Sequence, residues 1–196
     1  MTQIGSARLV QWKRRDVLAL AMAAGIVPVS SQSAEASSSA QEIDRDSREA
    51  LKRLEAQGGK TQELVQKAIA ILIFPNIIKG GLIIGGQYGD GALIQQGKTI
   101  GYYNIAAASF GLQAGGQSFS YALLFQKQSA LDYLQKSDGW SIGSGPSVVV
   151  MDKGAAGSLT STTVTQDVVA IPFGQKGLMA GLGLEGSKIT SITPSD

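Results

Sequence analysis

The segment Gly139-Trp140-Ser141-Ile142-Gly143 has the spacing of the nucleophile elbow of serine hydrolases. In that motif a base, normally histidine, takes the serine proton. The chain contains no histidine and no cysteine, so the usual base and a cysteine nucleophile are both absent. A dyad of Ser141 with Lys136 or Lys153 is the remaining catalytic alternative, and nothing else in the sequence supports it. We therefore interpret the motif as a turn anchored by Trp140, and expect no enzymatic activity.

Two glycine patterns come close to nucleotide-binding motifs. Gly181 to Gly186 has the dinucleotide spacing, but too little sequence follows it for the helix and strand that complete such a site. Five residues, where the phosphate loop has four, separate Gly91 from Gly97-Lys98-Thr99, and that loop depends on its spacing to aim backbone amides at phosphate. We expect neither segment to bind a nucleotide.

Metal ligands and paired carboxylates are scarce. Zinc sites rely on cysteine and histidine, which the chain lacks. Most acidic residues after residue 64 stand beside glycine or at expected strand ends, where turn chemistry accounts for them. We therefore expect no cofactor and no metal ion. These acidic residues are Asp90, Asp132, Asp138, Asp152, Asp167, Glu185 and Asp196.

Residues 1–36 are predicted to be an export signal. A basic start is followed by an apolar stretch from Val17 to Val29, which is too short to span a bilayer as a helix. Ala34 and Ala36 form a small-x-small cleavage pattern. The pair Arg14-Arg15 indicates the twin-arginine route, with a Sec signal or a merely basic tail as alternatives. We expect a periplasmic or secreted protein that begins near Ser37.

Cleavage changes the charge of the chain. The leader carries four of the seventeen basic residues and two of the fifteen acidic ones, so 13 of each remain. The remaining chain is therefore neutral overall, and a broad cationic field that would attract nucleic acid is not expected.

After the leader, the sequence predicts a linker and an amphipathic helix over 37–60 and one domain over 61–196. Ser39 and Glu42 have the spacing of a capping box at the start of that helix. Gly58-Gly59 should end it. A second helix is predicted from Thr61 to about Ile73, where Pro75 stops it.

From Gly80 the pattern changes, because eleven glycines occur in 37 residues, too many for a packed helix. Tyr88-Gly89-Asp90-Gly91 is predicted to be a hairpin turn. The order indicates an α+β fold, with N-terminal helices on a largely antiparallel sheet, either open or barrel-like, and one inserted helix at Ser129 to Lys136. The predicted strands are Ala92 to Gln96, Thr99 to Ala106, Phe110 to Gly116, Ser118 to Phe125, Ser147 to Met151, Ser158 to Thr165, Val168 to Phe173, Leu178 to Leu184 and Lys188 to Ile192.

Four motifs in order, from about Ala68 to Ile189, resemble those of the SYLF-domain family, the lipid-binding domain of the yeast actin-patch type, and in particular its exported bacterial branch. They are an apolar-Pro segment, a glycine-rich hairpin, a Gly-x-Gln-x-Gly-Gly strand and a Gly-Leu-x-Ala-Gly-x-x-Leu-Glu-Gly ending. Here they read Ile73-Phe74-Pro75, Lys79-Gly80-Gly81 through Gly85-Gly86-Gln87-Tyr88-Gly89-Asp90-Gly91, Gly111-Leu112-Gln113-Ala114-Gly115-Gly116 and Gly177 to Gly186.

The resemblance implies a non-catalytic domain that binds membrane lipids, which are phosphoinositides in eukaryotic members, sometimes together with actin filaments. An exported protein meets neither, so we expect lipids as a class and do not expect actin. The alternative is an envelope module that binds a protein or the cell wall without specific lipid binding.

The first predicted helix offers a physical route to lipids. Its apolar stripe could lie among headgroups while its cations face an anionic surface. The alternative is that the stripe covers one face of the sheet. A pair of tyrosines could also sit at an interface, although core packing is expected for at least one. The candidate lipid-interacting residues are Arg45, Arg48, Lys52, Arg53, Tyr102 and Tyr103.

Overall fold

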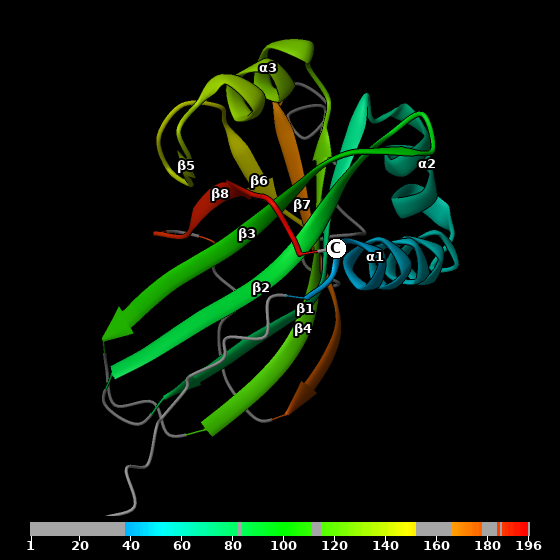
Figure 1. The fold of residues 1–196 in the computed structure, drawn as a ribbon. Helices are drawn as coiled ribbons and strands as arrows, with labels where there is room; N and C mark the ends of the chain where they lie inside the picture. Colours follow the sequence, from blue (N-terminus) through cyan, green and yellow to red (C-terminus); the bar gives the residue numbers. More distant parts are fainter. Residues whose placement is uncertain are drawn as a thin grey trace, which may run out of the picture. The chain divides into compact units, whose positions relative to one another are not determined.

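The computed structural model describes residues 38–81, 84–110, 115–151, 166–177, 184 and 186–195. Over these ranges the chain forms three α-helices and eight β-strands (Figure 1). The predicted α+β class is confirmed. The elements are α1 (Ala40–Glu55), α2 (Gly59–Lys67), β1 (Ala70–Gly81), β2 (Ile84–Gln95), β3 (Lys98–Phe110), β4 (Gly115–Phe125), α3 (Gln128–Lys136), β5 (Trp140–Ser141), β6 (Val148–Val150), β7 (Val168–Gly177) and β8 (Lys188–Ile192).

All eight strands belong to one sheet, in the order β5-β8-β3-β2-β1-β4-β7-β6. Every neighbouring pair is antiparallel except β6 and β7, which run parallel. The long strands β1 to β4 twist strongly, and the sheet curls into a half-barrel (Figure 1). The prediction of a largely antiparallel sheet is therefore confirmed.

The two faces of the sheet are covered by different helices. On the α1 face, Ala50 and Leu54 of α1 pack against side chains such as Ile73 and Leu124. On the α3 face, Leu131 of α3 joins a second core that includes Leu72, with the fully buried Trp140 beside it. Among the described residues, no helix is both long enough and apolar enough to cross a bilayer.

The start of α1 has the predicted capping box. The Ser39 hydroxyl accepts a hydrogen bond from the Glu42 amide at 3.2 Å, and a Glu42 carboxylate oxygen accepts one from the Ser39 amide at 3.3 Å. The regular helix ends at Glu55, three residues before the predicted Gly58-Gly59.

The second predicted helix is wrong over its last residues. Helix α2 ends at Lys67, and Ala70 to Ile73 belong to β1 instead. The cause is burial on both faces, because β1 lies between β2 and β4 and both of its faces are covered. A strand in such a position is a continuous apolar run without alternation, and periodicity cannot distinguish it from a buried helix.

The predicted hairpin turn at Tyr88 to Gly91 is also wrong, because these residues lie inside β2. The turn is instead at Gln96 and Gly97, whose φ angles of 51° and 75° fit a two-residue hairpin loop. Gly89 and Gly91 instead allow the backbone of β1 to lie close to β2. A Cβ at Gly91 would overlap the carbonyl oxygen of Ile73 on β1.

Most remaining predicted elements have counterparts. The inserted helix is α3, and the strands predicted at 92–96, 99–106, 118–125, 147–151, 168–173 and 188–192 correspond to parts of β2, β3, β4, β6, β7 and β8. Of the strand predicted from Phe110 to Gly116, Phe110 belongs to β3 and Gly115 to β4, while 111–114 lie outside the described residues. The predicted strand Ser158 to Thr165 lies outside them entirely, as does Leu178 to Leu184 except for Leu184.

Pro75 and Asn76 form a β-bulge in the centre of the sheet. Between Phe74 and Ile77, β1 advances three residues while its partner β4 advances two, from Tyr121 to Phe119. The register with β2 also shifts in this region. Proline cannot donate to a ladder, and a bulge is one of the few places where a sheet tolerates it.

Candidate functional site

Helix α1 is fixed to the β2–β3 hairpin through Arg48. The Arg48 guanidinium donates to Asp44 at 2.7 Å, to the Gly97 carbonyl at 3.0 Å and to the Thr99 hydroxyl at 3.2 Å. The Thr99 hydroxyl also donates to Asp44. The hydrogen bond from Arg48 lowers the pKa of the Asp44 carboxyl, against the opposing effect of burial, and Thr99 lowers it further. Arg48 is therefore engaged within the fold.

The other predicted cations of α1 are exposed. Arg45 forms an ion pair with its neighbour Asp46 at 2.9 Å. Lys52 and Arg53 form no ion pair with any described residue. The apolar stripe of α1 is buried against the sheet, with Leu54 fully buried. The helix therefore covers a face of the sheet, which was the alternative to lying among headgroups.

The two candidate tyrosines face opposite sides of the sheet, as successive residues of a strand must. Tyr102 lies on the α1 face, half-buried against the cluster of Ile43, Ala92 and Ile94. Tyr103 belongs to the core of the α3 face, where burial raises the pKa of its hydroxyl. Its side chain is only 6% exposed, so the prediction of Tyr103 as a lipid contact does not fit this fold.

Strand pairing places one row of residues across the α1 face beyond α1. Each member lies directly opposite the next on the neighbouring strand, so all share that face. We call this the outer row. It consists of Lys176 on β7, Ser118 on β4, Ile78 on β1, Tyr88 on β2, Ala106 on β3 and Lys188 on β8.

The centre of the outer row is apolar and its ends are basic. Ile78 and Tyr88 are 62% and 56% exposed, the largest exposures among the large apolar and aromatic side chains that the structure describes. Lys176 and Lys188 are also exposed. An exposed aliphatic–aromatic pair of this kind in the middle of a sheet is a candidate contact surface.

No local pattern in the sequence identifies this row. Counting alternate residues along β1 from Leu72 and Phe74 would place Ile78 on the α3 face, and only the bulge brings it to the α1 face. Lys176 and Lys188 are only 12 residues apart in the sequence, yet the strand order places β7 and β8 on opposite sides of the central strands, so that the two lysines end one row.

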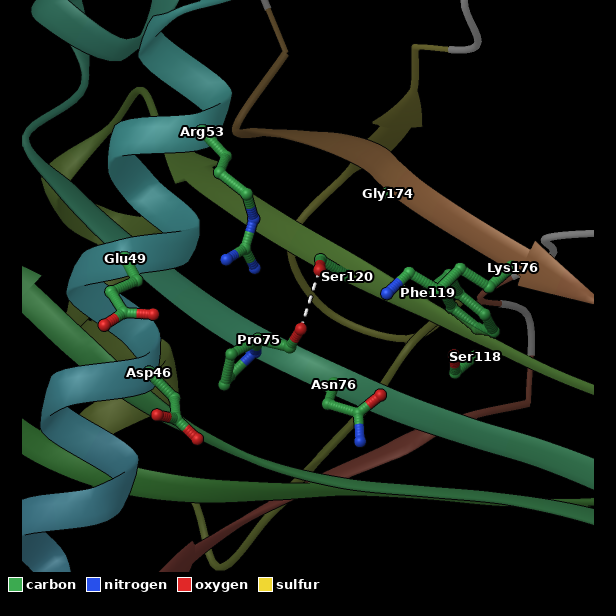
Figure 2. Close-up of a pocket in the computed structure, with 10 residues that line it drawn as sticks. All are labelled: Asp46, Glu49, Arg53, Pro75, Asn76, Ser118, Phe119, Ser120, Gly174 and Lys176. Carbon is green, nitrogen blue, oxygen red and sulfur yellow. Dashed lines mark hydrogen bonds between the residues drawn. The ribbon is translucent and has the colours of Figure 1, made fainter.

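Beside the outer row, a cleft of about 550 Å³ lies between α1, the bulge of β1, β4 and β7 (Figure 2). We call it the α1 cleft. Its floor contains Ser120, whose hydroxyl donates to the Pro75 carbonyl at 2.7 Å. The full lining is Asp46, Glu49, Arg53, Pro75, Asn76, Ser118, Phe119, Ser120, Gly174 and Lys176.

The charged groups of the α1 cleft are arranged by sign. Figure 2 shows the Arg53 guanidinium and the Lys176 ammonium pointing toward Ser120 from opposite sides, whereas Glu49 and Asp46 lie earlier along α1, on the side of Pro75 and Asn76. Neither Arg53 nor Lys176 has an ion-pair partner within the part of the chain that the structure describes.

A smaller hollow of about 310 Å³ lies toward the start of α1 and is bordered by Ile78 and Tyr88. It shares Asp46, Pro75 and Asn76 with the α1 cleft. The apolar pair of the outer row is therefore next to polar hollows, and the whole surface is continuous around the bulge.

The segment around Ser141 forms a turn. Trp140 is fully buried and donates from its indole nitrogen to the Ser144 carbonyl at 2.9 Å. Ser141 is exposed on β5, directly opposite Lys188 on β8, and no hydrogen bond joins their two side chains within the described residues. This agrees with Trp140 acting as an anchor.

The predicted export residues Arg14, Arg15, Ala34 and Ala36 lie outside the described residues. Within the described ranges, no group of three or more acidic side chains is placed to hold a metal ion.

A comparison with protein families matches residues 106–194 to the family described as "Ysc84: Las17-binding protein actin regulator". The matched segment begins at Ala106 in the outer row and contains β4, α3 and the strands β5 to β8. The chain has no significant match among curated proteins.

Proposed function

Because residues 106–194 belong to the Ysc84 (SYLF) family, which is associated with lipid binding and actin regulation, we propose that this chain binds membrane lipids without catalysing a reaction. The observation that carries the proposal is the exposed Ile78–Tyr88 pair with a lysine at each end of its row. The absence of histidine and cysteine from the sequence supports a non-catalytic role.

The outer row has the composition of an interfacial surface. Ile78 reaches the boundary of the acyl chains, and Tyr88 occupies the headgroup level, where its ring and hydroxyl suit the mixed environment. Lys176 and Lys188 attract anionic lipids, each contributing about 1 kcal/mol near such a surface. Because the row is built on paired strands, little conformational entropy is lost on binding.

We also propose that the protein works outside the cytoplasm, in the periplasm or after secretion. The support is the leader pattern over 1–36. The test is the N-terminal sequence of the protein recovered from its host. A start at Ser37 supports export, and an uncleaved Met1 in the cytoplasmic fraction contradicts it.

Vesicle flotation tests the lipid proposal. The full chain is mixed with vesicles of phosphatidylcholine alone or of phosphatidylcholine with phosphatidylglycerol, so that residues 1–36 are the same in every sample. We expect more protein to float with the anionic vesicles, and less at high salt because salt screens the lysines. Failure to float with either vesicle contradicts the proposal.

The printed description of the family favours a second candidate, a protein-binding module. The test is co-sedimentation of the full chain with actin filaments, together with recovery of protein partners in detergent and high salt. Pelleting with filaments and no flotation on vesicles would favour this candidate over lipid binding.

A further inference from the structure

We propose that the α1 cleft binds a phosphoethanolamine group, a phosphate ester joined by a two-carbon arm to a primary ammonium. This inference rests on the proposed lipid function, because the cleft is continuous with the outer row. Lys176 and Ser118 belong to both. A lipid that contacts the row could therefore present its headgroup to the cleft.

The charge balance of the cleft favours a zwitterion over an anion. The lining carries both signs of charge, with Arg53 and Lys176 on one side and Glu49 and Asp46 on the other; Asp46 is already paired with Arg45, so Glu49 is the carboxylate that faces a ligand's cation. A phosphate bound alone would gain the two cations but remain near the Glu49 carboxylate, which repels it. A ligand with both signs of charge gains from both groups.

The placement of the charges fits the two ends of this ligand. Arg53 and Lys176 both point toward Ser120, so a phosphate above Ser120 meets a cation on either side (Figure 2). Glu49 stands one helical turn before Arg53, about 6 Å along the axis of α1. This offset between the helix positions that supply the two charges is comparable to the length of the two-carbon arm, so the ammonium is assigned to Glu49.

The lining also distinguishes a primary ammonium from a quaternary one. Sites for quaternary ammonium groups use exposed aromatic faces. The aromatic residue of this cleft is Phe119, which is only 2% exposed and belongs to the core of the α3 face. The Glu49 carboxylate and the exposed Asn76 instead offer oxygens that accept hydrogen bonds from an N–H group.

The cleft volume of about 550 Å³ lies within the range of pockets that bind small molecules. Because the same group occurs in a phospholipid and in soluble glycerophosphoethanolamine, the experiment uses both. Calorimetric titration of the full chain compares glycerophosphoethanolamine, glycerophosphocholine and inorganic phosphate. Flotation compares vesicles of phosphatidylcholine with and without phosphatidylethanolamine.

We expect glycerophosphoethanolamine to bind about tenfold more tightly than glycerophosphocholine or phosphate. Glu49→Gln should remove this preference. Arg53→Gln should weaken the binding of glycerophosphoethanolamine by a similar factor. Both residues are exposed, so the fold should tolerate the changes. Glu55→Gln, exposed on α1 and outside the cleft, is the matched control and should change nothing.

Equal affinity for glycerophosphoethanolamine and glycerophosphocholine overturns the inference. It is also overturned if inorganic phosphate binds as tightly as glycerophosphoethanolamine. Loss of the preference in Glu55→Gln overturns it as well. If flotation on anionic vesicles persists in any of these cases, the cleft assignment fails while the lipid function stands. A preference seen with the soluble compound but not with vesicles upholds the site and assigns it to a free ligand.

Discussion

Replacing Ile78 and Tyr88 by serine removes the apolar centre of the outer row and leaves its lysines in place. Full burial of a large apolar side chain contributes about 1.5–3 kcal/mol. Ile78 and Tyr88 are still 62% and 56% exposed, so roughly half of that gain is available on contact with a membrane. With about 1 kcal/mol from each residue, the double variant should lose about 2 kcal/mol of membrane affinity, or roughly 30-fold in partitioning.

The assay is flotation over a series of lipid concentrations on phosphatidylcholine–phosphatidylglycerol vesicles, from which a partition coefficient is obtained. Ile100→Ser is the matched control, because Ile100 is 41% exposed on β3 and lies outside the row. Thermal denaturation checks that each variant is folded, and the exposure of the replaced side chains predicts small changes in Tm.

The membrane role of Ile78 and Tyr88 is refuted if the double variant partitions like the unmodified chain. It is equally refuted if Ile100→Ser loses as much affinity, because the effect would then come from general hydrophobicity. A loss of salt dependence in the double variant would also contradict it, since both lysines of the row remain.

Three further predictions concern the fold that carries these surfaces. Lys127 at 2.8 Å, with two hydrogen bonds from Ser147, lowers the pKa of the Asp167 carboxyl to about 2. A lowered pKa stabilises the fold above the unfolded value near 4 and is lost as pH falls toward 2, so Asp167→Asn should cost about 1–2 kcal/mol at pH 7 and almost nothing near pH 2 in urea titrations; a constant difference contradicts this. Gly91→Ala should cost about 1–3 kcal/mol, because its Cβ would overlap the β1 backbone, and an unchanged urea midpoint would exclude that overlap. Arg48→Ala should lower unfolding free energy by about 1 kcal/mol, and Arg48→Lys should not restore it, because an ammonium cannot reproduce the three contacts of the guanidinium; full rescue by lysine argues against them.

Local signals were reliable where one segment determines its own structure. The capping box at Ser39 and Glu42 placed the start of α1 within one residue, because the two side chains satisfy amides only three positions away. Helix α3 and several strands were predicted for the same reason. The order of the predicted helices and strands was also sufficient to indicate an α+β fold with a mostly antiparallel sheet.

Sequence patterns predicted the wrong structure where neighbouring strands determine the conformation of a segment. The apolar run before Pro75 reads as a helix until β2 and β4 are placed on either side of it. The sequence alone predicts a turn at Gly91. The structure shows that a glycine is needed there because the backbone of β1 lies against it. The candidate cations of α1 were identified by type, but only the fold distinguishes Arg48, which is engaged by the hairpin, from Arg53, which points into the cleft.

One irregularity, the bulge at Pro75 and Asn76, produces both surfaces. Without the extra residue, alternation from Phe74 would turn Ile78 toward the α3 face, and the outer row would lose its apolar centre. The same two residues line the α1 cleft, and the Pro75 carbonyl there accepts the Ser120 hydroxyl. Because β1 is a central strand whose first residues, Ala70 to Phe74, are buried on both faces, the row and the cleft are attached to the core of the protein. A lipid contact built in this way needs no loop to order on binding, so its affinity depends on the exposed side chains and their charges.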